Sequence, residues 1–132
     1  IEGKMPLMVH SGDYRYSYSH PERLRRVMKD FPRLVTIAAH FGGWSMPDEG
    51  VKQLSDRENC FVDISSSFDR ISLNKGAELV SAFGEDRVLF ASDFPLGSPT
   101  TERENLMKMN ISDDIREKIA YKNAERLLGF SI

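Results

Sequence analysis

The chain has a single cysteine, Cys60, so it cannot form an internal disulfide. This cysteine lies in an apolar stretch, and a buried, reduced thiol of this kind predicts a cytoplasmic compartment. No apolar run is long enough to cross a bilayer and no signal peptide is evident, so we expect no membrane partner. The net charge is only −2 and the lysines and arginines are scattered, which argues against a nucleic-acid partner.

The remaining composition is that of an ordinary globular protein, with 40% hydrophobic and 29% charged residues. A length of 132 residues is enough for a single domain over 1–132, and such a domain buries roughly two-thirds of the surface of its unfolded chain. The sequence begins at Ile1 rather than at a methionine, and it enters an apolar run almost at once. We therefore expect it to be a piece of a longer polypeptide.

Short apolar runs alternate with amphipathic stretches along the whole chain. The runs predict strands at 5–10, 34–40, 59–64 and 87–91. The segments between and after them predict helices at 19–31, 47–57, 74–83, 98–109 and 112–128. We expect the first helix to begin with a capping box from Ser19 to Glu22, and to bury an apolar stripe that includes Val27 and Phe31.

Equivalent strand positions recur every 25 to 28 residues, which describes a βα unit repeated four times. Such units form a parallel sheet with right-handed crossovers, and all strands then point their C-terminal ends toward one rim. The predicted fold is therefore an α/β, parallel (βα)4 unit. It is either one half of a (βα)8, or TIM, barrel or an open flavodoxin-like sheet.

Three side chains that can bind metals stand where predicted strands end, namely His10, His40 and Asp93. Because these ends share one rim, we expect the two imidazoles and the carboxylate to converge, and these are ligand types that a divalent metal takes. Each residue also has a structural interpretation: a histidine at a strand end can simply be hydrogen-bonded, and Asp93 can close the turn that follows it. Asp63 alternates within its strand, and we expect it to pair with a neighbouring polar group.

Two further residues in loops at this rim are candidates for substrate binding. Arg15 stands among three tyrosines, and its guanidinium either meets a substrate carboxylate or is an ordinary surface charge. Trp44 follows the second strand, and its ring either lies over a planar substrate or plugs the rim.

The strand ends carry motifs that are similar to those of a known family. They read VHSGD at 9–13, AHFGG at 39–43 and FASDFP at 90–95, and the last helix contains KNAERLLG at 122–129. In this order and spacing they resemble the amidohydrolase-2 branch of the amidohydrolase superfamily, which includes aminocarboxymuconate-semialdehyde-decarboxylase-like proteins. The resemblance covers nearly the whole chain but only strands five to eight of the family's barrel, so it implies a C-terminal half of a TIM barrel.

This resemblance implies a role for each residue at the strand ends. His10 and Asp93 would bind the metal, Asp93 would also hold its water, and His40 would handle protons or substrate, so that His40 and Asp93 are the catalytic pair. The implied cofactor is a divalent metal, zinc first, with manganese or iron as alternatives. The family's His-x-His pair on strand one has no match in this chain, so two ligands would have to come from the missing part.

Together these points predict a metal-dependent hydrolase in which a metal-activated water attacks a C–N or C–O bond of a small-molecule substrate, with the fragment inactive alone. Non-oxidative decarboxylation is the alternative within the family, and a non-catalytic flavodoxin-like module is the alternative outside it. Half a barrel leaves two strands without a neighbour. We therefore expect the chain to form a homo-oligomer or to associate with the missing N-terminal half.

Overall fold

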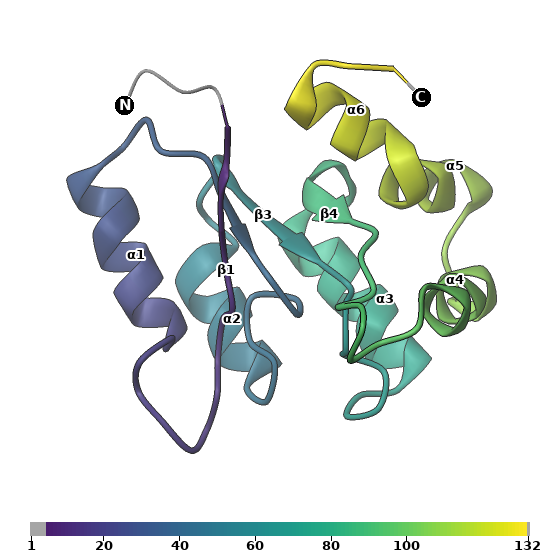
Figure 1. Ribbon diagram of the computed structural model, residues 1–132, viewed down its shortest axis with the longest axis horizontal. Helices are drawn as coiled ribbons and strands as arrows, with labels where there is room; N and C mark the ends of the chain where they lie inside the picture. Colours follow the sequence, from purple (N-terminus) through teal and green to yellow (C-terminus); the bar gives the residue numbers. More distant parts are fainter. Residues whose placement is uncertain (1–4, 132) are drawn as a thin grey trace.

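The computed structural model of the chain describes residues 5–131, and its centre is a four-stranded parallel sheet (Figure 1). The strands are hydrogen-bonded in the order β1-β2-β3-β4, which is also their order along the chain. Their bounds are β1 Leu7–Val9, β2 Thr36–Ala38, β3 Cys60–Asp63 and β4 Val88–Leu89. Sequential order is what a barrel requires, whereas the flavodoxin-like sheet has the order 2-1-3-4-5. The (βα)4 prediction is confirmed, and the flavodoxin-like alternative is not supported by this order.

A helix follows each strand, and the last strand is followed by several. The helices are α1 Pro21–Asp30, α2 Pro47–Leu54, α3 Leu73–Phe83, α4 Pro99–Lys108, α5 Asp113–Glu117 and α6 Asn123–Leu128. A 3-10 turn at Glu85–Arg87 precedes β4, and a π-helical turn at Lys118–Lys122 joins α5 to α6. Serine side chains cap three of these helices, and Gly129 ends α6 in the left-handed region with φ 73°. Within residues 5–131, no helix is long and apolar enough to cross a membrane.

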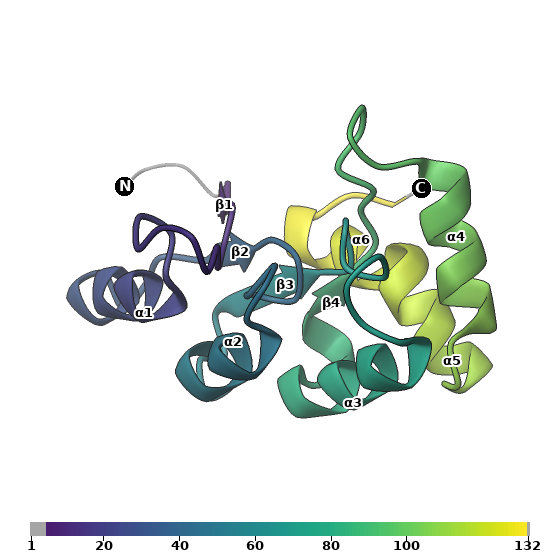
Figure 2. The same ribbon diagram turned by 90° about the horizontal axis from the view of Figure 1, so that it is seen from below.

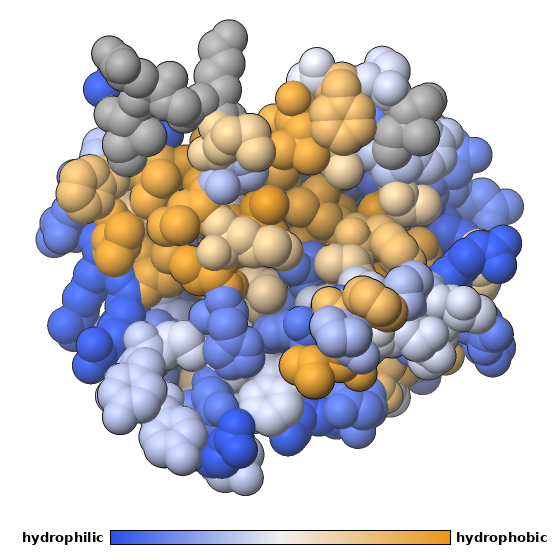
Figure 3. All heavy atoms as spheres, in the orientation of Figure 1, coloured by the Kyte–Doolittle hydropathy of each residue, from blue (hydrophilic) through white to orange (hydrophobic). Residues whose placement is uncertain are grey.

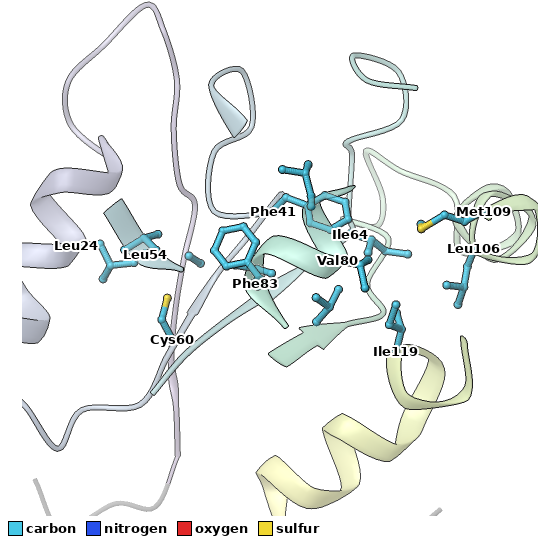
Figure 4. Close-up of a cluster of buried hydrophobic side chains, with 14 of the residues drawn as sticks. Leu24, Phe41, Leu54, Cys60, Ile64, Val80, Phe83, Leu106, Met109 and Ile119 are labelled. Atoms are coloured by element: carbon cyan, nitrogen blue, oxygen red, sulfur yellow. The ribbon is translucent and has the colours of Figure 1, made fainter. Parts of the chain in front are cut away.

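Helices α1, α2 and α3 lie along one face of the sheet, and α4 to α6 gather beyond β4 (Figure 2). The hydrophobic core lies between this sheet face and the helices (Figure 4). Its fully buried side chains include Leu54, Cys60, Phe83 and Ile119. The prediction that Cys60 is a buried free thiol is confirmed.

The opposite face of the sheet carries no helix in the part of the chain that the structure describes (Figure 2). Met8 of the edge strand β1 is 56% exposed on this side, next to Ile37 of β2 with which it is in register. A broad hydrophobic area covers this side of the molecule over β1 and the middle of the sheet (Figure 3). One half of a TIM barrel is expected to look like this, because its inner face is normally filled by side chains from both halves.

Two details of the first helix differ from the sequence-based expectation. The cap of α1 is His20, whose ring nitrogen accepts from the Glu22 amide 3.2 Å away, so the predicted Ser19 capping box is wrong. Val27 and Phe31 are 39% and 55% exposed, because α1 packs at the open edge of the sheet beside β1. There they line an apolar hollow of about 380 Å³ together with Leu34 and the segment 5–7, which leads into β1.

The strands are also shorter than predicted, and the second strand shows why. The predicted run 34–40 becomes Thr36–Ala38, because His40 and Phe41 take left-handed backbone angles with φ of 60° and 52°. A strand cannot continue through such residues. The polypeptide therefore turns sharply at the point where the candidate site begins.

Candidate active site

A pocket of about 660 Å³ lies at the C-terminal ends of the strands. All five side chains predicted from the sequence to serve the site line it: His10, Arg15, His40, Trp44 and Asp93. Parallel strands bring residues that are far apart in the sequence to one rim, which is the ligand-binding end of α/β folds. The expected convergence of the strand ends is therefore present in the structure.

The two histidines are in direct contact. His10 Nδ1 lies 3.0 Å from His40 Nε2, and the rings meet edge-on with centroids 4.9 Å apart. His40 is only 6% exposed, and its Nδ1 lies 2.9 Å from the carbonyl oxygen of Ser65. A carbonyl only accepts, so Nδ1 carries the proton and Nε2 presents its lone pair toward His10.

The surroundings of His10 favour the neutral imidazole. Desolvation by the site is the largest cause that lowers the pKa of His10, and the neighbouring ring of His40 adds to it. The carboxylates of Asp13 and Asp93 act in the opposite direction. The net shift is downward, and the neutral form of histidine is the one that binds a metal ion.

Asp93 follows β4 at a left-handed turn, with φ of 62°. The turn is closed by its backbone, since the Asp93 carbonyl accepts from the amides of Leu96 and Gly97 at 2.8 and 3.0 Å. The side chain is turned toward the neighbouring loop, where Ser66 Oγ donates to Asp93 Oδ2 at 2.8 Å. The carboxylate is therefore not used to close its own turn, and it remains exposed at the pocket.

The residues present agree with a divalent metal in type but not in number. Two imidazoles bound to one tetrahedral ion at about 2.0–2.1 Å would have nitrogens on the order of 3.3 Å apart. The 3.0 Å between His10 Nδ1 and His40 Nε2 is shorter than that separation and is a hydrogen bond, in which His10 Nδ1 donates to the lone pair of His40 Nε2. Within residues 5–131, however, no three His, Cys, Asp or Glu side chains are grouped tightly enough to hold an ion. The chain thus has a partial donor set: two adjacent imidazoles, with the Asp93 carboxylate in the same pocket.

Arg15 and Trp44 both lie at the pocket, but Arg15 already has a partner. Its Nε and Nη2 donate to the carboxylate of Asp13, at 3.0 and 2.7 Å. These bonds lower the pKa of Asp13 to about 2. Two guanidinium groups lie over the Trp44 ring, that of Arg15 at 5.6 Å and that of Arg70 at 3.8 Å from its centroid. The pocket mouth therefore presents an aromatic ring that two guanidinium groups contact, beside the carboxylates of Asp13, Asp69 and Asp93.

The sequence reasoning did not identify four residues at this site. Asp63 and Ser65 hold His40, Ser66 holds Asp93, and Arg70 covers Trp44. Asp63 could have been found by the same rule that found the others, because it also ends a strand. The expectation that it pairs with a polar group is confirmed, since its Oδ1 accepts from the amides of His40 and Ser65.

Comparison with known proteins places this geometry in a wider context. The family model described as Amidohydrolase matches residues 1–130. No curated protein matches the chain. Among solved structures, an uncharacterised TIM-barrel protein from Bordetella bronchiseptica is 27% identical, with a TM-score of 0.80 over 96% of this chain and 46% of its own.

Two similar structures contain a bound metal. A dihydroxybenzoic acid decarboxylase from Polaromonas with bound manganese is 18% identical, with a TM-score of 0.71 over 96% of this chain and 50% of its own. An amidohydrolase from Burkholderia multivorans with bound zinc is 15% identical, with a TM-score of 0.62 over 83% of this chain and 50% of its own. At these identities the likeness establishes the fold, and the chain spans about half the length of each structure.

Proposed function

The chain belongs to the amidohydrolase family, and from this premise we propose that it carries the C-terminal half of the active site of a metal-dependent hydrolase. The substrate would be a small molecule whose C–N or C–O bond is attacked by water. The observation that carries the proposal is the contact of 3.0 Å between His10 Nδ1 and His40 Nε2, in the pocket that Asp93 also lines.

His10 and Asp93 are the side chains that would hold the metal, with further ligands coming from outside this chain. A divalent ion bound there lowers the pKa of a ligated water to about 7, which makes it a nucleophile at neutral pH. Zinc is our first choice and manganese the alternative, and the bound zinc and manganese in two structures of this fold support both.

His40 and Asp93 are the groups that we expect to move protons. His40 Nε2 bears a lone pair, because Nδ1 is committed to the Ser65 carbonyl, and it can accept a proton from water and return it to the leaving group. Asp93 can orient the same water through the carboxylate oxygen that does not bind Ser66. Trp44 and the two arginines over its ring would hold a planar or anionic part of the substrate.

The guanidinium of Arg70 over the Trp44 ring favours non-oxidative decarboxylation as a second candidate. Arg70 forms no ion pair with any side chain in residues 5–131, so its charge is available to a substrate carboxylate. The similarity to a dihydroxybenzoic acid decarboxylase supports the same reading. Isotopes separate the two reactions. Hydrolysis places ¹⁸O from labelled water in the product, whereas decarboxylation releases labelled CO₂ from a substrate carboxylate.

In the described chain the open face of the sheet carries no helix, and its two edge strands lack a second neighbouring strand (Figure 2). β1 and β4 each pair with only one strand in the described chain, and Met8 is exposed on the uncovered side. We propose that four further βα units close the barrel here, as in the solved structures of twice this length. They would also bring the ligands that the partial donor set lacks.

Metal analysis tests the proposed function directly. The intact protein is expected to retain about one divalent ion per chain after dialysis, and His10→Ala is expected to lose it. His20→Ala is the matched control, because His20 caps α1 outside the pocket. Intact protein that binds no metal, or equal metal content in both variants, would overturn the assignment.

A further inference from the structure

His40 has a strained backbone, and a single residue of the neighbouring strand holds it in place. His40 and Phe41 both have positive φ, a strained conformation for these residues that persists only where the surroundings enforce it. Asp63 provides both restraints. Its Oδ1 accepts from the His40 amide at 3.1 Å, and its carbonyl accepts from the Phe41 amide at 2.7 Å.

The ring of His40 is held by the next polar residue along the same strand end. Its Nδ1 lies 2.9 Å from the Ser65 carbonyl and 3.0 Å from Ser65 Oγ. The Ser65 hydroxyl donates to Asp63 Oδ1, so its oxygen is left as an acceptor that faces Nδ1. Both oxygen atoms near Nδ1 are therefore hydrogen-bond acceptors, so Nδ1 is the donor and carries the proton.

The carboxylate of Asp63 is 0% exposed, and within residues 5–131 its Oδ2 has no hydrogen-bond partner. A buried polar atom without a partner costs free energy. That cost is offset at the other oxygen, Oδ1, which accepts three hydrogen bonds, and all three donors belong to His40 and Ser65.

We propose that Asp63 and Ser65 are positioning residues that lock His40 in the Nδ1–H tautomer, with the lone pair of Nε2 directed into the pocket toward His10. Asp63 sets the backbone angle and Ser65 sets the ring, and together they leave Nε2 3.0 Å from His10 Nδ1. A histidine held in this way needs no reorientation before it accepts a proton. The proposal rests on the proposed function, in which His40 is the proton-handling group.

The tautomer can be measured without substrate and without metal. The intact protein is labelled with ¹⁵N-histidine, stripped of metal with a chelator, and examined by NMR at about pH 8, where an ordinary histidine with a pKa of about 6.5 is neutral. His40 is assigned by its absence in His40→Asn. We expect its Nδ1 to be protonated and its Nε2 to be bare in essentially all molecules.

Variants show whether Asp63 and Ser65 set this tautomer. Asp63→Ala is expected to convert the single tautomer into a mixture with the Nε2–H form. Should Asp63→Ala fail to fold, the nearly isosteric Asp63→Asn replaces it, because its amide can donate to Ser65 Oγ and so free that hydroxyl to donate to Nδ1. Ser11→Ala is the matched control, since this buried hydroxyl donates to the Gly42 carbonyl beside the same turn. A wild-type protein with the Nε2–H form, or variants that keep the pure Nδ1–H form as Ser11→Ala does, would overturn the proposal.

The tautomer measurement and the metal analysis distinguish failure of this proposal from failure of the proposed function. A pure Nδ1–H tautomer that the variants convert into a mixture, in a protein that binds no metal, would support the positioning of His40 and overturn the proposed metal-dependent function. A protein that binds metal, but whose His40 tautomer does not change in the variants, would support the proposed function and overturn the positioning role of Asp63 and Ser65.

Discussion

Ser66 Oγ donates to Asp93 Oδ2 at 2.8 Å, which ties the loop after β3 to the turn after β4. Both residues have left-handed backbones, with φ of 45° for Ser66 and 62° for Asp93. Two sharp turns, 27 residues apart in the sequence, thus present their side chains to each other at the pocket. The hydrogen bond fixes one oxygen of the carboxylate and leaves the other for a ligand.

Ser66→Ala should therefore weaken metal binding without removing a ligand. Loss of a partner that orients a metal ligand typically costs 10–100-fold in affinity, and we expect a decrease in that range. Competition with a coloured chelator measures it in the intact protein. Ser17→Ala, in the exposed loop after β1, is the control and should leave the affinity unchanged. Equal affinities would mean that Ser66 does not orient Asp93 for the metal.

Gly97→Ala should disrupt the turn that carries Asp93. A methyl group added at Gly97 would lie 1.8 Å from the Ser92 carbonyl oxygen, so the backbone has to move. We expect a loss of about 3 kcal/mol in the free energy of unfolding. Gly129→Ala is the comparison, because a methyl group there meets nothing within 4 Å and only the left-handed backbone is penalised, by about 1 kcal/mol. Urea titration of both variants checks the order, and a smaller loss at Gly97 would contradict the close packing of this turn.

The sequence was sufficient for the parts of the site that depend on strand direction. His10, His40 and Asp93 each follow a β-type run, and parallel strands must bring such residues to one rim. It was not sufficient for contacts between loops. Asp63 and His40 are 23 residues apart, and nothing in their local patterns indicates that one holds the other.

Two predictions from local sequence patterns in α1 were wrong, because the rest of the fold determines where the helix begins and which of its side chains are buried. Ser19 and Glu22 have the spacing of a capping box, yet the chain enters α1 one residue later and His20 becomes the cap. Val27 and Phe31 have the period of a buried stripe, but α1 lies at an edge of the sheet where no further unit of the described chain covers them. Periodicity shows which side chains share a face, and only the neighbours decide whether that face is buried.

Glu102 should make stability depend on pH in a predictable direction. It is 6% exposed on α4, and burial is the main cause that raises its pKa, with Asp69 and Asp63 adding to it. The folded state therefore holds this proton more tightly than the unfolded chain does, whose glutamate pKa is about 4.3. The stability that the protonated form contributes is present below that pH and is lost as the pH rises through the raised pKa of the folded state.

Glu102→Gln removes this titration. Urea unfolding at several pH values should show that the variant gains stability relative to the wild type as the pH rises from below about 4.3 toward neutrality. A constant difference between the two proteins across that interval would show that Glu102 does not titrate differently on folding.

The uncovered face of the sheet should make the chain of 132 residues associate when it is expressed as such. Multi-angle light scattering is expected to give a mass above 15.1 kDa that increases with concentration. Met8→Lys, at a site 56% exposed on the open face, should lower that mass. Met107→Lys, 54% exposed on α4, should not. Four added βα units that abolish the association would identify the occupant as a barrel half, whereas a stable dimer of fixed mass would identify a second copy. A monomer at high concentration would contradict both.

The central claim is that the strand ends of this chain share one metal ion, and anomalous diffraction from crystals of the intact protein, grown with zinc and with manganese, tests it most directly. The account predicts one anomalous peak in the pocket, within about 2.3 Å of a ring nitrogen of His10 and of an Asp93 carboxylate oxygen. It also predicts that His40 Nε2 faces that peak. A peak bound elsewhere, or metal-loaded crystals in which His10 and Asp93 stay apart with no ion between them, would contradict it.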